Sequence, residues 1–71
     1  MKEAVNHPDH YNVGKIEVID FIEAWGLNFA EGSVVKYITR YKFKGKPVED
    51  LKKARFYIDR LIKEATSNEP G

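Results

Sequence analysis

The clearest indication of the fold class is the stretch PVEDLKKARFYIDRLIKEA, residues 47–65. Small and aliphatic residues recur in it every three or four positions, and they are Leu51, Ala54, Ile58, Leu61 and Ala65. This period is typical of one face of an α-helix that packs against another helix. Pro47 suits the first helical position, and Glu49 and Asp50 fall in the first turn, where the helix dipole favours acids. The stretch therefore predicts an amphipathic helix over 47–65.

The segment before it, residues 29–43, has the same helical period. Val34, Ile38 and Tyr41 lie at i, i+4 and i+7, so they share one stripe of a helix. Gly32 is unfavourable inside a helix by up to about 1 kcal/mol relative to Ala. We therefore expect Gly32 either to mark the start of this helix or to permit another helix to pack closely against it.

The N-terminal third of the chain predicts one more helix and an irregular arm. Residues 15–26 carry a broad apolar face at helical spacing and end in a glycine, which is a natural helix stop. Residues 1–14 are rich in turn formers, and Pro8 biases His7 away from helical geometry. At the other end of the chain, residues 66–71 are expected to fray.

Together these patterns predict an all-α fold, a small bundle of three helices preceded by the arm, in one domain over residues 1–71. The chain has no cysteine, which excludes disulfides and thiolate metal sites. A core of this size rarely supplies more than about 3–5 kcal/mol of net stability, yet the 71 residues include one Trp, four Phe and four Tyr. We therefore expect the chain to assemble as a homo-oligomer.

The hydropathy of the chain argues against a membrane protein. No apolar run approaches the roughly 20 residues that span a bilayer. The N-terminus also lacks the apolar core of a signal peptide. We expect a cytoplasmic protein without a membrane partner.

The formal net charge of +1 hides a strong asymmetry along the chain. Residues 32–46 contain five basic residues and no acidic one, whereas residues 1–31 contain six acidic residues and two basic ones. Residues 47–71 balance five of each. The middle segment is thus a concentrated basic patch. The balanced total argues against nucleic acid as a partner, since backbone binding depends on many cations.

Within this patch the residue spacing favours a phosphate site. Lys36 and Arg40 lie one helical turn apart on the same face, and such a pair can clamp phosphate oxygens. Tyr37 beside them could stack a base, and Lys44 continues the charge into the following loop. The same pattern also fits a solvated cationic face beside core tyrosines.

The arm carries hydrogen-bonding side chains that could cover a site or a neighbouring subunit. These are His7, His10 and Tyr11. A His-x-x-His pair can also bind a metal when it lies on a helix, but Pro8 disfavours that geometry. No third ligand follows in sequence, although a carboxylate of residues 15–26 could supply one. We therefore predict no metal site in the arm.

Several acids could support a site or simply be solvated. Glu17, Asp20 and Glu23 step by three along the expected helix over 15–26, and two of them could share Mg²⁺ with substrate phosphates. Acids on the polar stripe of such a helix are more often solvated, which is the interpretation we favour. Glu49 and Asp50 suit a helix N-terminus and could also orient Lys53 or a base from residues 29–43.

Three motifs, in order and spacing, resemble a known family. They are NHPDHY at 6–11 followed by GKIEVID at 14–20, KYITR at 36–40 followed by KGK at 44–46, and EDLKKA at 49–54 followed by YI at 57–58. Over about residues 5–61 the chain resembles a small phage family catalogued as domain of unknown function 3310. Its members are often labelled nucleotide kinase, after a larger phage enzyme.

The resemblance implies a phage-encoded protein that acts on nucleotides in the cytoplasm of the host cell during infection. It also carries over a set of candidate site residues. These are His7, His10, Tyr11, Glu17, Lys36, Tyr37, Arg40, Lys44, Glu49, Asp50 and Lys53.

Two functions follow as hypotheses. In the first, a helical oligomer holds a phosphorylated nucleotide without turnover, sequestering for example a host immune signal as an anti-defence sponge. In the second, the chain is a nucleoside monophosphate kinase in which Lys36 and Arg40 stabilise the transferring phosphoryl group and an acid holds Mg²⁺. The sequence contains no Gly-x-x-x-x-Gly-Lys-Ser/Thr phosphate loop and no dinucleotide fingerprint, so we favour sequestration, which needs no cofactor.

Overall fold

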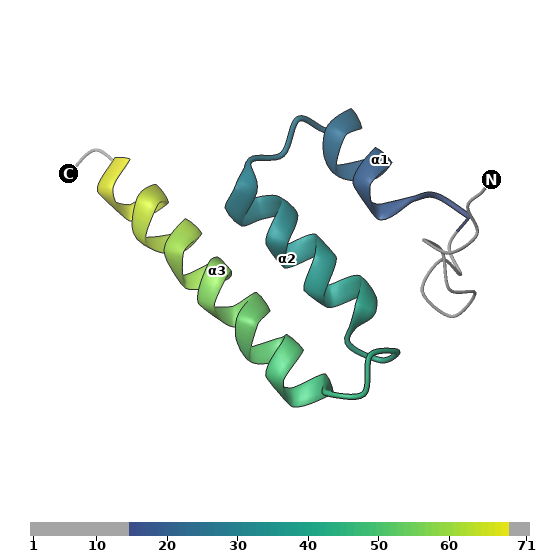
Figure 1. The fold of residues 1–71 in the computed structure, drawn as a ribbon. Coiled ribbons are helices and arrows are strands. Elements are labelled where there is room, and N and C mark those ends of the chain that lie inside the picture. The colour runs from purple at the N-terminus through teal and green to yellow at the C-terminus, as the bar shows by residue number, and fades with distance from the viewer. Residues whose placement is uncertain (1–14, 69–71) are drawn as a thin grey trace.

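The structure, a computed structural model, describes residues 15–68 and contains three α-helices in that range. They are α1 (Val18–Ala24), α2 (Phe29–Arg40) and α3 (Pro47–Asn68). Figure 1 shows α2 and α3 running antiparallel side by side, with α1 on the other flank of α2. The described residues form no strand, so the predicted all-α class and the three-helix bundle are confirmed. The arm expected over 1–14 lies outside the described residues.

The first helix is shorter than predicted at both ends. The helical spacing of apolar residues begins before Val18, but Lys15 has a φ of 69°, which a right-handed helix does not contain. Glu17 is an extended N-cap residue with φ −64° and ψ 137°. At the other end, Gly26 has a φ of 64° and donates to the Glu23 carbonyl, while Leu27 donates to the Ile22 carbonyl. These two bonds form the Schellman motif that ends α1 at the predicted glycine.

The second helix begins where it was predicted and ends three residues earlier. Asn28 and Glu31 form a capping box: each side chain accepts a 2.9 Å hydrogen bond from the backbone N–H of the other. At the C-terminal end the chain turns after Arg40, and the Phe43 N–H donates to the Arg40 carbonyl at 2.9 Å. The turn leads through Gly45, whose φ is 85°, to the start of α3.

The third helix continues to Asn68, three residues beyond the predicted end. Residues 66–68 are therefore helical, which corrects the expectation of a frayed tail from residue 66. The helix has no Gly or Pro between Pro47 and Pro70 to interrupt it. Residues 69–71 lie outside the described range.

The buried core of the described residues is small. Ala54, at 2 % exposed, is the one buried hydrophobic side chain in residues 15–68. Gly32 is also buried, and a Cβ there would lie 3.1 Å from Ile22 Cγ2, so the close-packing alternative for this glycine is correct. Large apolar side chains stay exposed, among them Trp25 at 71 % and Phe29 at 77 %. No helix within residues 15–68 is long and apolar enough to cross a membrane.

Candidate functional site

Three cationic side chains converge on the ring of Tyr37. Lys36 Nζ lies 5.3 Å and Arg40 Cζ 5.0 Å from the ring centroid, both on α2. Lys53 reaches the same ring from α3, with its Nζ 5.6 Å from the centroid. Cation–π attraction favours cations within about 6 Å of a ring centroid. We call Lys36, Arg40 and Lys53 the cation cluster; antiparallel packing of α2 and α3 brings its members together.

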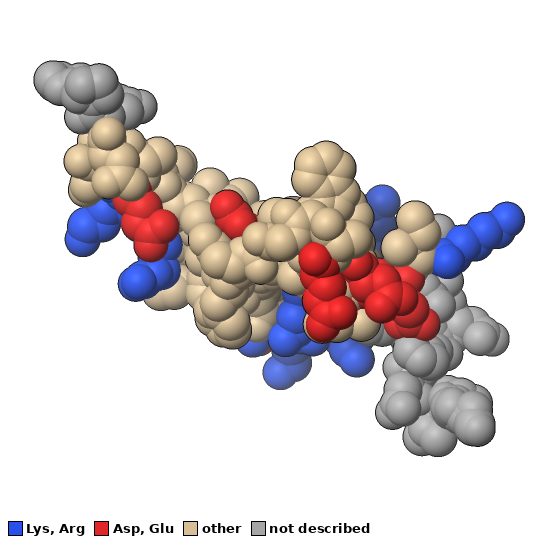
Figure 2. All heavy atoms as spheres, turned by 90° about the horizontal axis from the view of Figure 1, so that it is seen from above, with Lys and Arg blue, Asp and Glu red and all other residues tan. Residues whose placement is uncertain are grey.

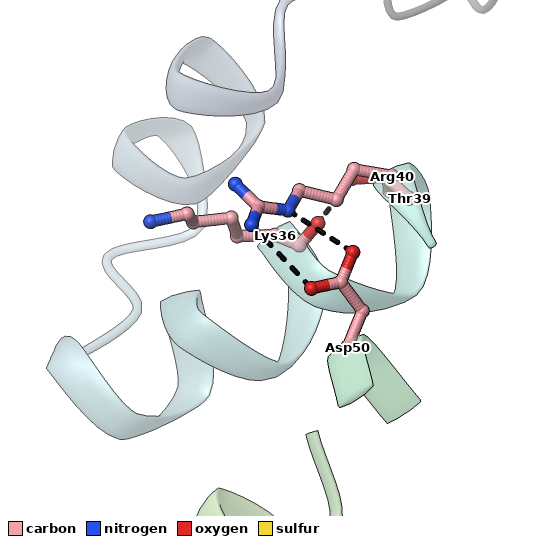
Figure 3. A network of polar contacts seen from close by, with 4 residues as sticks. All are labelled: Lys36, Thr39, Arg40 and Asp50. Atoms are coloured by element: carbon pink, nitrogen blue, oxygen red, sulfur yellow. Dashed lines mark hydrogen bonds and ion pairs between the residues drawn. The ribbon is translucent and has the colours of Figure 1, made fainter. Parts of the chain in front are cut away.

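Arg40 is held in place by a buried carboxylate. Its Nε lies 3.3 Å from Asp50 Oδ2 and its Nη2 lies 3.4 Å from Asp50 Oδ1, so the two planar groups meet side-on. Figure 3 shows the Asp50 carboxylate at the edge of the Arg40 guanidinium, with Lys36 extending from the same helix. The Asp50 side chain is 4 % exposed and that of Arg40 is 24 % exposed. Asp50 thus lies in the first turn of α3, as expected, and also contacts a base on α2.

The ion pair between Arg40 and Asp50 leaves N–H donors of Arg40 without a partner in that pair, and it does not neutralise the charges of Lys36 and Lys53. A guanidinium has five N–H donors, of which Asp50 engages two, so three remain on Nη1 and Nη2. Within residues 15–68 the structure gives neither Lys36 nor Lys53 an acidic partner. The cation cluster therefore has more positive charge than the adjacent carboxylate neutralises, which suits an anion with several oxygens.

A pocket of about 290 Å³ opens beside the cation cluster. All three helices and the linker between α1 and α2 line it, with the residues Ile19, Ile22, Leu27, Asn28, Phe29, Gly32, Ser33, Lys36, Tyr37 and Tyr57. Tyr57 lies nearly parallel to Tyr37, with ring centroids 6.4 Å apart and planes at 11°, and meets Phe29 edge-on at 5.7 Å. Ser33 is only 8 % exposed. The pocket therefore has aromatic and aliphatic walls. It shares Lys36 with the cation cluster, and Tyr37, the ring that the cluster surrounds, also lines it.

A model of one protein family matches residues 5–59, and its description is "protein of unknown function (DUF3310)". The chain belongs to the DUF3310 family. The match covers α1, α2 and the part of α3 that carries Asp50, Lys53 and Tyr57, so it includes the whole candidate site. Comparisons with curated proteins and with solved structures gave no match.

The DUF3310 chain does not bring every predicted residue into this site. Lys44 lies in the linker between α2 and α3 and does not line the pocket. Glu17 is the N-cap of α1, and Glu49 is exposed in the first turn of α3. The predicted roles of His7, His10 and Tyr11 concern residues outside the described range.

Three acidic residues of the DUF3310 chain, Glu17, Asp20 and Glu23, lie on α1 or at its N-cap, whereas the cation cluster lies on α2 and α3. Figure 2 shows acidic side chains gathered over the end of the molecule where α1 lies, with several basic side chains projecting below them. Within residues 15–68 no group of three or more His, Asp or Glu side chains is arranged to hold a metal ion. Glu17, Asp20 and Glu23 thus form no such centre among themselves.

Of the ten residues that line the pocket, only Lys36 and Tyr37 were predicted site residues. Phe29, Ser33 and Tyr57 are among those that were missed. A helical stripe in the sequence could have revealed them, because Phe29, Ser33 and Tyr37 follow one another at intervals of four. On α3 the matching stripe is Asp50, Lys53 and Tyr57, at intervals of three and four. The two stripes face each other in the DUF3310 fold, and this pairing builds the site.

Proposed function

We propose that this protein binds a phosphorylated nucleotide at the cation cluster and holds it without turnover. The observation that carries the proposal is the convergence of Lys36, Arg40 and Lys53 on one tyrosine ring, with Asp50 as the neighbouring acid. Lysine and arginine bind phosphate through charge-assisted hydrogen bonds, and Arg40 is already oriented by its carboxylate. The adjacent aromatic pocket supplies a surface on which a base can stack.

Sequestration fits this site better than catalysis does. A kinase must place a donor and an acceptor phosphate in line and exclude water from both. The described part of one chain offers one cation cluster, and a single nucleotide suffices to occupy it. In the setting that the family resemblance implies, the protein would act in the cytoplasm of an infected host and lower the free concentration of a nucleotide, for example an immune signal.

The alternative is a nucleoside monophosphate kinase without a phosphate loop. Preorganised Arg40 is the observation that favours it, because a fixed guanidinium can stabilise charge on a transferring phosphoryl group. In that case Mg²⁺ would be required, and a second copy of the chain would have to complete the site.

We also propose that the chain forms a homo-oligomer. A second hollow of about 440 Å³ lies between α1 and α2, and it is lined by Ile16, Val18, Phe21, Val34, Val35, Ile38 and Thr39. It shares no residue with the pocket beside the cation cluster. Exposed apolar surface of this kind supports association, since the described residues bury so little apolar side chain by themselves.

One experiment separates these functions. Purified protein is incubated with a nucleotide pool and Mg²⁺, with and without ATP, then removed and denatured, and both fractions are analysed by mass spectrometry. We expect one nucleotide class to be depleted from solution and released unchanged. Conversion of a monophosphate to a diphosphate only in the presence of ATP would establish the kinase instead. A pool that is neither depleted nor converted would contradict both.

A further inference from the structure

Ser33 stands out among the buried groups of this protein. It is 8 % exposed, and within residues 15–68 the structure gives its hydroxyl no hydrogen-bond partner. Buried polar groups are normally satisfied, since leaving a donor or acceptor unpaired is unfavourable. Ser33 lines the pocket beside the cation cluster, so a molecule in that pocket is positioned to provide the missing partner.

The walls of the pocket indicate the shape of that molecule. Among its lining residues, Phe29 and Tyr57 meet edge-on, and Ile22 packs against Gly32. Such walls favour a flat apolar group, which can stack on an aromatic ring. A hydroxyl can both donate and accept, so Ser33 suits a flat group with polar atoms at its edge.

The pocket and the cation cluster form one continuous site. Lys36 belongs to the cluster and also lines the pocket, and so does Tyr37, the ring on which the cluster converges. A ligand that fills both therefore joins a flat polar ring to a phosphate. The pocket volume of about 290 Å³ lies at the small end of the range for ligand sites, about 300–1,000 Å³, which suits a single ring system.

We propose that the pocket is the base subsite of this protein and that its ligand is a free mononucleotide. The base lies between the aromatic wall and α1 and hydrogen-bonds to Ser33 Oγ, while the 5′-phosphate lies against Lys36, Arg40 and Lys53. The proposal rests on the proposed function and deepens it: the phosphate supplies attraction and the pocket selects a base. A longer nucleic acid, which would run past the cluster, is not the ligand.

The test compares ligands that share a phosphate and differ in the base. Binding of ribose 5-phosphate, of the ribonucleoside 5′-monophosphates and 5′-triphosphates, and of a single-stranded oligonucleotide is measured by isothermal titration calorimetry. We expect at least one nucleotide to bind about 10-fold or more tightly than ribose 5-phosphate, because stacking adds to phosphate binding. The oligonucleotide is expected to bind no more tightly than ribose 5-phosphate.

The variant that tests the subsite is Ser33→Ala, with Ser67→Ala near the end of α3 as its matched control. Ser33→Ala is expected to weaken nucleotide binding about 3- to 10-fold, the equivalent of one hydrogen bond, and to leave ribose 5-phosphate binding unchanged. Ser67→Ala is expected to change neither. Circular dichroism of both variants checks that the helices persist.

A second pair of variants probes the stacking wall without touching Ser33. Tyr57→Leu is expected to reduce the preference for nucleotide over ribose 5-phosphate. Tyr41→Leu, the same change at a tyrosine that neither lines the pocket nor contacts the Tyr57 ring, is expected to keep it. If nucleotides and ribose 5-phosphate bind equally, the base subsite is wrong and phosphate binding stands. If neither binds, the proposed function itself fails. Tighter binding of the oligonucleotide would also overturn the mononucleotide proposal.

Discussion

Arg40 and Asp50 are joined side-on at the end of the α2–α3 pair, with contacts of 3.3 Å and 3.4 Å. The carboxylate is 4 % exposed, so its charge depends on the guanidinium for compensation. Arg40 thereby has two roles: it stabilises the helix pair and it presents its remaining N–H donors to the candidate site. A variant that removes Arg40 consequently disturbs both.

Arg40→Ala is expected to destabilise the protein by about 3 kcal/mol, because it leaves Asp50 buried without a partner. The double variant Arg40→Ala/Asp50→Ala is expected to be more stable than Arg40→Ala alone. Urea denaturation of both single variants, the double variant and the wild type completes a double-mutant cycle. All samples are compared at one protein concentration, since association shifts apparent stability. If the destabilisation of the double variant equals the sum of the two single-variant destabilisations, the ion pair is not coupled.

Lys53→Ala tests ligand binding without this complication. The Lys53 side chain is exposed and within residues 15–68 has no acidic partner, so stability is expected to change by less than about 0.5 kcal/mol. Affinity for a phosphorylated ligand is expected to fall about 10-fold, as for loss of one charge-assisted hydrogen bond. Lys52→Ala, the adjacent lysine, removes the same charge outside the cluster and serves as the control. Equal losses in both variants would indicate general charge attraction rather than a site.

Asn28→Ala is expected to lower the free energy of unfolding by about 1 kcal/mol, because it removes the side-chain half of the capping box with Glu31. Asn28→Asp is the control, since aspartate caps helices about as well as asparagine. Thermal or urea denaturation measures both. If Asn28→Ala has the same free energy of unfolding as the wild type, packing rather than the cap determines where α2 starts.

Ile38→Glu is expected to abolish self-association, because it places a charge in the apolar hollow between α1 and α2. Ile62→Glu puts the same charge at an exposed apolar position on α3, which does not line that hollow, and is expected to preserve association. Sedimentation equilibrium gives the mass of each variant. Dissociation by Ile62→Glu alone would move the interface to α3, and a monomeric wild type would contradict the oligomer itself.

The predicted parts of the fold are those set by neighbours along the chain. The spacing of Val34 and Ile38 indicated a helix, and Gly26 and Pro47 marked a helix end and a helix start that the structure confirms. The missed ends have local causes as well. Lys15 adopts a left-handed backbone that apolar spacing does not report, and the chain turns after Arg40 although the period continues to Phe43.

The candidate site likewise combines residues that helical spacing places together with residues that meet only through packing between helices. Sequence alone placed Lys36, Tyr37 and Arg40 together, because residues three or four apart on a helix share a face whatever the helix packs against. Only the tertiary structure decided that Asp50 meets Arg40, that Lys53 and Tyr57 reach Tyr37, and that Ser33 is enclosed. Those contacts depend on how two helices are turned toward each other. Helical periodicity fixes the order of side chains around each axis, but packing and the linker through Gly45 decide which stripe of α3 faces which stripe of α2.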